Sequence, residues 1–427
     1  MAANSSKSDN VFHGTTSTKT DVLYLSTYAH NGGMSIAANR IHRGLRSIGI
    51  NSKMLSMRVN CAEYNKSDNI FLVRSPRGHK WNPHYNMFSA NNMKFDSAIS
   101  GIDIRQYIDM FDPQIVQIHW VSDNFVSVED IGKITDRPVI WRLAECLAVT
   151  GGCYFVGKCE RYKDGCGKCP RLHSSLENDL SRTNWLRKQA AYNNIDLTIV
   201  VPTKAMERLV KASPLTKERR IVVIPNGLEL QLFYPEDKTA AREALGIPKD
   251  KKVILFGSCD VRDRRKGLHL LKKAMAKLAE NHRNEYHMVL FGGGSSSTKF
   301  DDIPTTGLGY INDKHKQRTA YSAADVMIVP SLEEPFGQTV TEAMACGTPV
   351  VTFRNIGPED MVDHKINGYI ANYADSYDLA AGIEWVLADD KRLQFLSANA
   401  RKKVETTYDI KIIANQYKKL YEELLNR

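Results

Sequence analysis

Short apolar runs, bounded by glycine, proline and polar residues, recur along the whole chain. Runs of this kind predict strands that are buried on both faces of a parallel sheet. In the first half of the chain they fall at 21–26, 50–57, 112–119, 139–143, 195–201 and 221–224. In the second half they fall at 252–257, 286–291, 326–329 and 349–353.

The segments between these runs have the spacing of amphipathic helices. Residues 35–48 place Ala37, Ile41 and Leu45 on one face, because apolar positions four residues apart lie one above the other on a helix. Further helices are predicted at 184–191, 204–211, 268–280, 314–323 and 338–346. Strands that alternate with helices favour an α/β fold. Between 59 and 100 no period is visible, and we expect loops with short helices.

Pro225, Gly227 and Pro235 favour a boundary between two domains, and we expect the hinge near 227–237. A chain of 427 residues is also long enough for more than one domain. We expect a first domain over 21–229 and a second over 230–405. Polar residues 1–20 predict a disordered start, and residues 406–427 predict an amphipathic C-terminal helix.

Composition limits the classes of partner. No apolar run approaches the roughly 20 residues that span a bilayer, and the polar N-terminus lacks a signal-peptide core. We therefore expect a cytoplasmic protein. The net charge of +10 favours anionic partners, either phosphorylated substrates or an anionic membrane surface. The chain has no basic tract interleaved with aromatic residues and no zinc-finger or helix-turn-helix pattern, so we expect no nucleic-acid partner.

The strand at 326–329 is followed by a loop, a helix that opens at Gly337, and another strand. The free N–H groups from Gly337 to Thr339 favour an anion, and phosphate is the most plausible one. Glu334 precedes the helix and Glu342 lies within it. Carboxylates accept hydrogen bonds from sugar hydroxyls. The alternative is that Glu334 caps the helix and Glu342 is solvated.

The same stretch reads Pro-Ser-x-x-Glu-x-Phe-Gly-x-x-x-x-Glu-Ala-Met-Ala-x-Gly-x-Pro-Val-Val from Pro330. This pattern resembles the retaining glycosyltransferases of family 4. The resemblance implies a GT-B architecture, in which two doubly wound Rossmann-like domains face a central cleft and the C-terminal helix packs across both. It also implies that a nucleotide-sugar binds mainly to the second domain. There Glu342 would hold the ribose hydroxyls and Glu334 the transferred sugar.

Further site residues follow from the resemblance. His119 ends the strand at 112–119, where ligands of open α/β sheets bind, and it would face the donor sugar; a core or loop histidine is the alternative. Lys266 and Gly267 match a diphosphate-binding pair, whereas Ser258 stands where the family has arginine, so Arg262, Arg264 or Arg265 would substitute unless this loop is only solvated. His119, Glu334 and Lys266 are the catalytic candidates. The expected donor-binding residues are Gly33, Ser258, Arg262, Arg265, Lys266, Gly292, Ile311, Glu334, Phe336, Gly337, Gln338, Thr339 and Glu342.

A cysteine-rich insertion is expected near 146–172, with Cys153, Cys159, Cys166 and Cys169. A cytosolic location disfavours disulfides, so the two hypotheses are a structural zinc site with four thiolates and reduced free thiols. Basic residues in the insertion would contact an acceptor diphosphate or a membrane; a solvated loop is the alternative.

The motif Trp-Arg-Leu-Ala-Glu-x-x-x-x-Thr-Gly-Gly-Cys, from Trp141, resembles a WcaC-like subgroup of colanic acid, capsule and O-antigen enzymes. Members commonly have Asp where this chain has Glu145. The resemblance implies a hexosyltransferase that moves a sugar from a GDP- or UDP-sugar to a glycan or lipid-linked oligosaccharide, at the cytoplasmic face of the inner membrane. No cofactor is expected to be required for catalysis. The alternatives are a non-catalytic nucleotide or sugar-binding protein of the same fold and a zinc-containing nucleic-acid binder.

Overall fold

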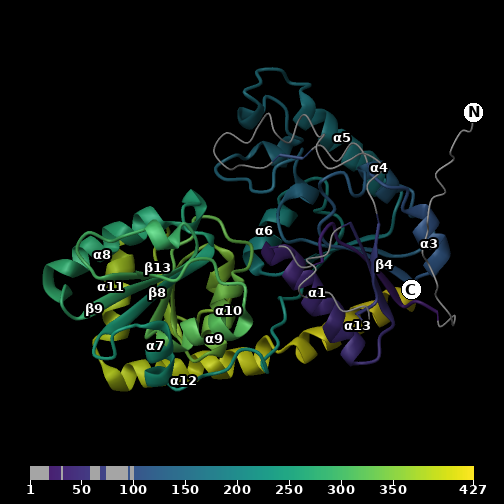
Figure 1. Ribbon diagram of the computed structural model, residues 1–427. Coiled ribbons are helices and arrows are strands. Elements are labelled where there is room, and N and C mark those ends of the chain that lie inside the picture. Colours follow the sequence, from purple (N-terminus) through teal and green to yellow (C-terminus); the bar gives the residue numbers. More distant parts are fainter. Residues whose placement is uncertain (1–18, 30–31, 58–67, 74–94, 97–100) are drawn as a thin grey trace, which may run out of the picture.

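The computed structural model describes residues 19–29, 32–57, 68–73, 95–96 and 101–427. Its described part contains two parallel sheets, each in its own lobe (Figure 1). Most of the expected segment 59–100 lies outside the described residues. No helix in the described part is long and apolar enough to cross a membrane.

The first sheet has the strand order β3-β2-β1-β4-β5-β6-β7. Its strands are β1 (Val22–Leu25), β2 (Ser52–Ser56), β3 (Ile70–Leu72), β4 (Ile115–Ile118), β5 (Val139–Arg142), β6 (Leu197–Val201) and β7 (Arg220–Val223). Helices α1 (Gly32–Ser47), α3 (Arg105–Phe111), α4 (Val128–Gly132), α5 (Leu180–Asn193) and α6 (Lys204–Lys211) connect them. The central strands are fully buried, as expected for apolar runs in a parallel sheet covered on both faces.

The second sheet has the order β10-β9-β8-β11-β12-β13. Its strands are β8 (Lys252–Asp260), β9 (Tyr286–Gly293), β10 (Thr305–Gly307), β11 (Val326–Val329), β12 (Val350–Phe353) and β13 (Gly368–Ala371). Its helices are α7 (Lys238–Leu245), α8 (Leu268–His282), α9 (Lys314–Ala323), α10 (Gln338–Ala345), α11 (Ser376–Leu387) and α12 (Asp390–Thr407). The chain order reverses beside β1 and again beside β8. The predicted pair of doubly wound α/β domains is confirmed.

The last helix, α13 (Ile410–Leu425), returns from the second domain to the first (Figure 1). Its apolar face is buried in the core that also contains Val22 and Tyr24 of β1. The linker runs alongside the start of this helix, because the N–H of Leu228 donates to the carbonyl of Tyr408 and the N–H of Ile410 donates to the carbonyl of Leu228. The two domains are therefore joined by two adjacent chain segments.

Candidate active site

Two of the predicted charged residues form an ion pair at the end of the second sheet. The Lys266 Nζ atom lies 2.5 Å from an Oε atom of Glu334. Lys266 follows β8 and Glu334 follows β11, and these strands are neighbours in the sheet. The side chains are 24% and 16% exposed, so an anion or a sugar hydroxyl can still reach both.

Two glycines make this arrangement possible. Gly267 has a φ of +76°, and a Cβ atom there would lie 1.8 Å from the carbonyl oxygen of Pro330. Gly337 has a φ of +99°, and its Cβ would lie 3.0 Å from the ring of Pro358. A side chain at 267 would push the loop that carries Lys266 away from the loop that carries Glu334.

Glu342 is buried between the two domains. One of its carboxylate oxygens accepts a hydrogen bond of 2.8 Å from Arg40 of α1, and the other accepts one of 2.9 Å from the hydroxyl of Tyr321. Burial, followed by the charge of Glu342, raises the pKa of Tyr321 well above its usual value. The alternative in which Glu342 is solvated is therefore wrong, because only 6% of the residue is exposed.

The first domain contacts the start of α10 directly. Arg40 donates a hydrogen bond of 2.7 Å to the side-chain oxygen of Gln338, and the amide nitrogen of Gln338 donates to the carbonyl of Gly33. The hydroxyl of Thr203 donates to the carbonyl of Pro335 at 2.9 Å. Arg40 and Gln338 thus link Gly33 and Glu342 across the domain boundary, and the role of these residues in donor binding stays a prediction.

The basic loop after β8 separates its arginines. Arg262 is 69% exposed and pairs with Asp260, whereas Arg265 is 24% exposed and pairs with Asp263 at 2.5 Å. The guanidinium of Arg265 also lies 3.9 Å from the ring centroid of Phe155, in the first domain. Among these two arginines, the structure places Arg265 at the domain interface.

His119 lies inside the first domain. It is 2% exposed, its ring stacks on Tyr24 at 4.7 Å, and its Nε2 atom is 3.0 Å from the amide nitrogen of Gln117. Burial lowers the pKa of His119 well below its usual value, so the ring is neutral. These contacts of His119 are with residues of the first domain, and its contact with a donor sugar stays a prediction.

The remaining predicted donor-binding residues lie at the end of β9, in the core of the second domain and in the first turn of α10. Gly292 has a φ of +115° and approaches Ser258 so closely that a Cβ would lie 1.8 Å from the Ser258 carbonyl oxygen. Ile311 and Phe336 are buried in the core of the second domain. Thr339, in the first turn of α10, is half-buried.

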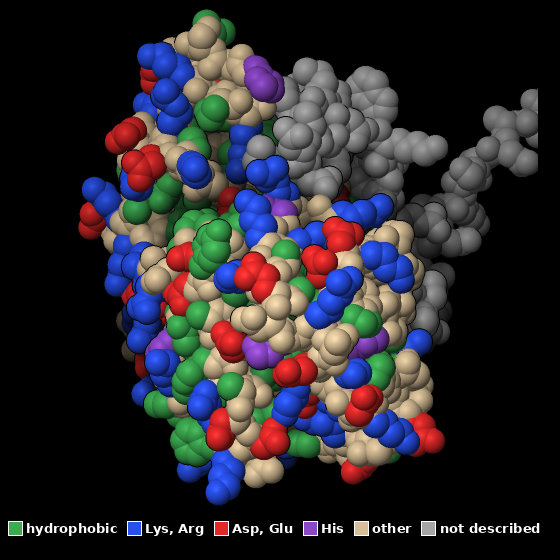
Figure 2. All heavy atoms as spheres, turned by 90° about the vertical axis from the view of Figure 1, so that its left-hand side faces the viewer, with side chains coloured by type: hydrophobic (Ala, Val, Ile, Leu, Met, Phe, Trp, Pro, Cys, Tyr) green, Lys and Arg blue, Asp and Glu red, His purple; other side chains and the backbone are tan. Residues whose placement is uncertain are grey.

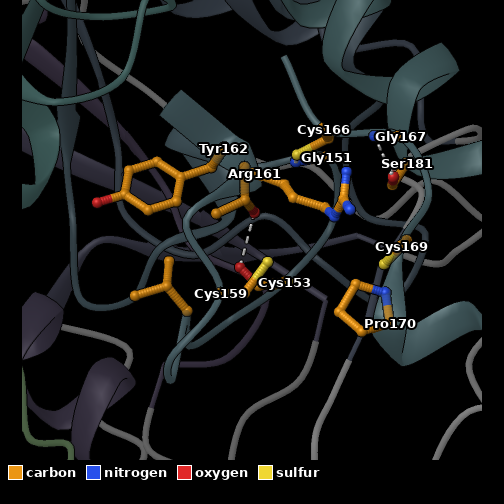
Figure 3. A pocket seen from close by; sticks show the side chains of 12 residues that line it. Gly151, Cys153, Cys159, Arg161, Tyr162, Cys166, Gly167, Cys169, Pro170 and Ser181 are labelled. Atoms are coloured by element: carbon orange, nitrogen blue, oxygen red, sulfur yellow. Dashed lines mark hydrogen bonds between the residues drawn. The ribbon is translucent and has the colours of Figure 1, made fainter. Parts of the chain in front are cut away.

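The four cysteines of the insertion line one cavity of about 20 Å³ (Figure 3). The sequence therefore correctly groups Cys153, Cys159, Cys166 and Cys169. In the described part of the chain, however, no three His, Cys, Asp or Glu side chains are placed so that they could hold a metal ion together. The predicted ligand geometry is not formed in this structure, and the zinc site stays a prediction.

Three residues at the interface were not found by sequence reasoning. Arg40 and Tyr321 hold Glu342, and Phe155 covers Arg265. Arg40 lies on an ordinary amphipathic helix and Tyr321 on another, so local sequence gives no signal for either. Phe155 follows the recognised Thr-Gly-Gly-Cys motif, which marks the insertion but not its contact with the second domain.

Residues 237–403 match the family model described as glycosyl transferases group 1. The second domain is therefore similar to the group 1 glycosyltransferases. Among curated relatives, an uncharacterized glycosyltransferase of Methanocaldococcus jannaschii is 26% identical over 410 residues, which cover 92% of this chain and 94% of the relative. A D-inositol 3-phosphate glycosyltransferase of Geodermatophilus obscurus is 36% identical over 198 residues, 43% of each chain.

Several solved structures share the fold of nearly all of this chain. A sucrose-phosphate synthase from Thermosynechococcus elongatus has a TM-score of 0.70 at 22% identity and covers 96% of this chain and 100% of its own. HepE from Anabaena, solved with UDP-glucose, has a TM-score of 0.65 at 17% identity, with 95% and 100% covered. WaaG, a glycosyltransferase involved in lipopolysaccharide biosynthesis, has a TM-score of 0.65 at 16% identity, with 94% and 99% covered. The predicted GT-B fold is confirmed.

Proposed function

We propose that the protein is a retaining glycosyltransferase that moves a sugar from a GDP- or UDP-sugar to a glycan or lipid-linked oligosaccharide. The observation that carries the proposal is the grouping of Lys266, Glu334 and Glu342 around the start of α10, at the boundary between two GT-B domains. A similar fold holds UDP-glucose in HepE, which supports a nucleotide-sugar as donor.

Charge stabilisation is the proposed source of catalysis. When the donor bond breaks, negative charge builds up on the diphosphate. The ammonium of Lys266, the guanidinium of Arg265 and the N–H groups at the start of α10 would favour that state over the ground state. Glu334 would exchange part of its ion pair with Lys266 for a sugar hydroxyl. Because the chain supplies these cations itself, the proposal requires no metal for the transfer.

The proposed place of action is the biosynthesis of a surface polysaccharide, as in the WcaC-like subgroup that the insertion resembles. The fold shared with WaaG is compatible with this role. The net charge of +10 supports an anionic partner, including the cytoplasmic face of an inner membrane. Basic and acidic side chains are mixed over the face shown in Figure 2, so that face offers no single basic patch.

The test begins with the donor. We would measure thermal shifts with GDP, UDP, ADP and dTDP, and then with the sugar conjugates of the nucleotide that stabilises most. A ligand at a hundred times its Kd adds about 2.7 kcal/mol to the folded state, which a thermal scan detects. Binding by one nucleotide and slow hydrolysis of its sugar conjugate would support an enzyme. Binding without turnover, with any glycan acceptor offered, would favour the non-catalytic alternative.

A further inference from the structure

The second domain has a large open cavity at the end of its sheet that is opposite to Lys266 and Glu334. Lys252 begins β8, Asp325 precedes β11 and Thr348 precedes β12, and all three line this cavity of about 750 Å³. Lys266 and Glu334 instead follow the other ends of β8 and β11. The cavity is therefore separate from the candidate active site. Its volume lies within the range of roughly 300–1,000 Å³ that is typical of ligand pockets.

Helix α12, which runs along the lower edge of the second lobe, forms one wall of the cavity (Figure 1). Its apolar residues Leu396, Ala400 and Val404 are buried in the domain. Its cavity residues are spaced by three or four positions and so lie on one face of the helix: Gln394, Ser397, Arg401 and Glu405. Ser397 and its neighbour Ala398 are small, which leaves this wall hollow near its middle.

Hydrogen bonds within the domain hold the inner end of the cavity. Four buried residues, each at most 5% exposed, line this end: Ser322, Asp325, Cys346 and Thr348. Asp325 accepts hydrogen bonds of 2.7 Å from the side chains of Lys238 and Arg242. The hydroxyl of Thr348 donates to the carbonyl of Tyr321 at 2.7 Å. A ligand would therefore meet a surface that is already formed, as in most small-molecule sites.

The lining of the cavity suits a ligand that has many hydroxyl groups and no charge. Among the described residues, four basic and four acidic side chains line it: Lys238, Lys252, Arg401 and Lys402, with Glu236, Asp325, Asp390 and Glu405. Gln394 and Lys402 are exposed at the rim. Amide and ammonium groups donate hydrogen bonds to sugar oxygens, and carboxylates accept them from sugar hydroxyls. Balanced charge together with both kinds of partner favours a neutral oligosaccharide over an ion.

We propose that this cavity binds a neutral oligosaccharide and keeps a glycan attached to the enzyme between transfers. The second part rests on the proposed function, which supplies a glycan as acceptor or product. Helix α10 has eight residues and a length of about 12 Å, and it runs from the candidate active site to Cys346 at the cavity. A glycan of a few sugars can span that distance. Binding at this second place raises the effective concentration of the glycan at the active site.

An array of neutral, amino-substituted and acidic glycans, probed with the full-length protein, tests the cavity. We expect retention on neutral oligosaccharides. Ala398→Trp, which fills the hollow from an exposed position of α12, should abolish this retention. Lys391→Trp places the same side chain at an exposed position of α12 outside the cavity and should bind like the wild type. No retention, retention of acidic glycans alone, or full retention by Ala398→Trp would overturn the proposal.

A milder variant decides if Ala398→Trp does not fold. Gln394→Ala removes one exposed amide from the cavity wall, so the Kd of the retained oligosaccharide should rise about three- to tenfold in calorimetry, as expected for one lost neutral hydrogen bond. An unchanged Kd would contradict the proposed site.

Nucleotide binding by the same samples separates this proposal from the proposed function. Thermal shifts with the preferred nucleotide should be equal in the wild type and in Ala398→Trp, because the cavity lies away from the candidate active site. Oligosaccharide binding at the cavity without any nucleotide binding would contradict only the proposed function. Nucleotide binding without retention of a neutral glycan would contradict only the inference about the cavity.

Discussion

Glu342 is buried and accepts two hydrogen bonds. Removing its charge therefore tests whether this residue contributes to donor binding. Glu342→Gln keeps the shape but removes the negative charge that Arg40 contacts and that, under the proposed function, ribose hydroxyls would contact. We expect the Kd of the preferred nucleotide to rise about 10- to 100-fold, since hydrogen bonds to charged groups contribute about 1.5–3 kcal/mol. Isothermal titration calorimetry measures this. Glu236→Gln, which breaks an ion pair with Arg318 in the same domain, is the control and should leave the Kd unchanged.

Lys266 is expected to act on the rate rather than on donor affinity alone. Lys266→Met removes the cation nearest to Glu334, and we expect kcat to fall about 100- to 1,000-fold, as when one stabilising group is removed from a transition-state site. Lys272→Met, which changes a lysine of α8 that lies over the Phe300 ring, should have wild-type kcat. Equal loss in both variants would remove Lys266 from the catalytic role.

Glu145 should make stability depend on pH. Burial raises its pKa from 4.5 to about 8, while the N–H of Leu147 and the charge of Lys188 oppose the shift and Asp96 adds to it. Between these pH values the folded protein binds more protons at this site than the unfolded chain does. The free energy of unfolding therefore decreases as pH rises from about 4.5 to about 8.

Thermal unfolding of Glu145→Gln across this pH range tests whether Glu145 causes the loss of stability. The decline in melting temperature with rising pH should be smaller in the variant, because glutamine does not titrate but still accepts a hydrogen bond from Leu147. Lys188, whose pKa burial lowers to about 8, gives a slope of opposite sign only above that pH. If melting temperature fell equally with pH in the variant and the wild type, the pH dependence could not be assigned to Glu145.

At the scale of elements, α1 of the first domain and α10 of the second are joined by Arg40. Arg40 contacts Glu342 at 2.8 Å and Glu229 at 3.4 Å, and all three side chains are at most 10% exposed. Arg40→Met leaves two buried carboxylates without this partner, so we expect a loss of about 3–5 kcal/mol in urea unfolding. Arg43→Met is a matched control, because Arg43 also faces Glu229 but is 53% exposed.

A double variant distinguishes the loss of the ion pair between Arg40 and Glu342 from the loss of packing around Arg40. If the loss in Arg40→Met comes from the uncompensated Glu342, then adding Glu342→Gln should recover part of it, and the two effects should not add. Additive losses would show that Arg40 acts by packing, including its contact with the Phe233 ring at 5.5 Å.

The elements that the sequence predicts best are the buried ones. Central strands such as β4 and β11 are continuous apolar runs, because helices cover both sheet faces, and their ranges agree with prediction within two or three residues. The short strands β3, β10 and β13 were missed, since each has only three or four residues and at least half of these are not fully buried.

Prediction of the site was limited in a similar way, because local motifs are visible in the sequence but contacts between distant segments are not. Glu334 and Lys266 can be proposed as site residues from local motifs, but their ion pair joins loops 68 residues apart, and hydrophobic periodicity does not predict that contact. Arg40 and Glu342 are separated by 302 residues, and they come into contact only when the two domains pack against each other.

At the scale of the whole molecule, the first domain is completed by a helix from the far end of the chain. Ile413, Tyr417, Leu420, Tyr421 and Leu424 of α13 are buried against the first sheet, and Tyr421 donates a hydrogen bond of 2.6 Å to Gln117 of β4. Without α13 this face would expose an apolar patch that promotes aggregation.

We therefore expect the fragment 1–229 to be insoluble when expressed alone, whereas the fragment 230–409 should fold. Co-expression of 1–229 with 230–427 should restore a soluble complex, because α13 then covers the first sheet. Solubility, circular dichroism and cooperative thermal unfolding of the fragments measure this. A soluble fragment 1–229 with a cooperative thermal transition would contradict this expectation. The first domain would then have a complete core without α13, and α13 would serve mainly to hold the two domains together.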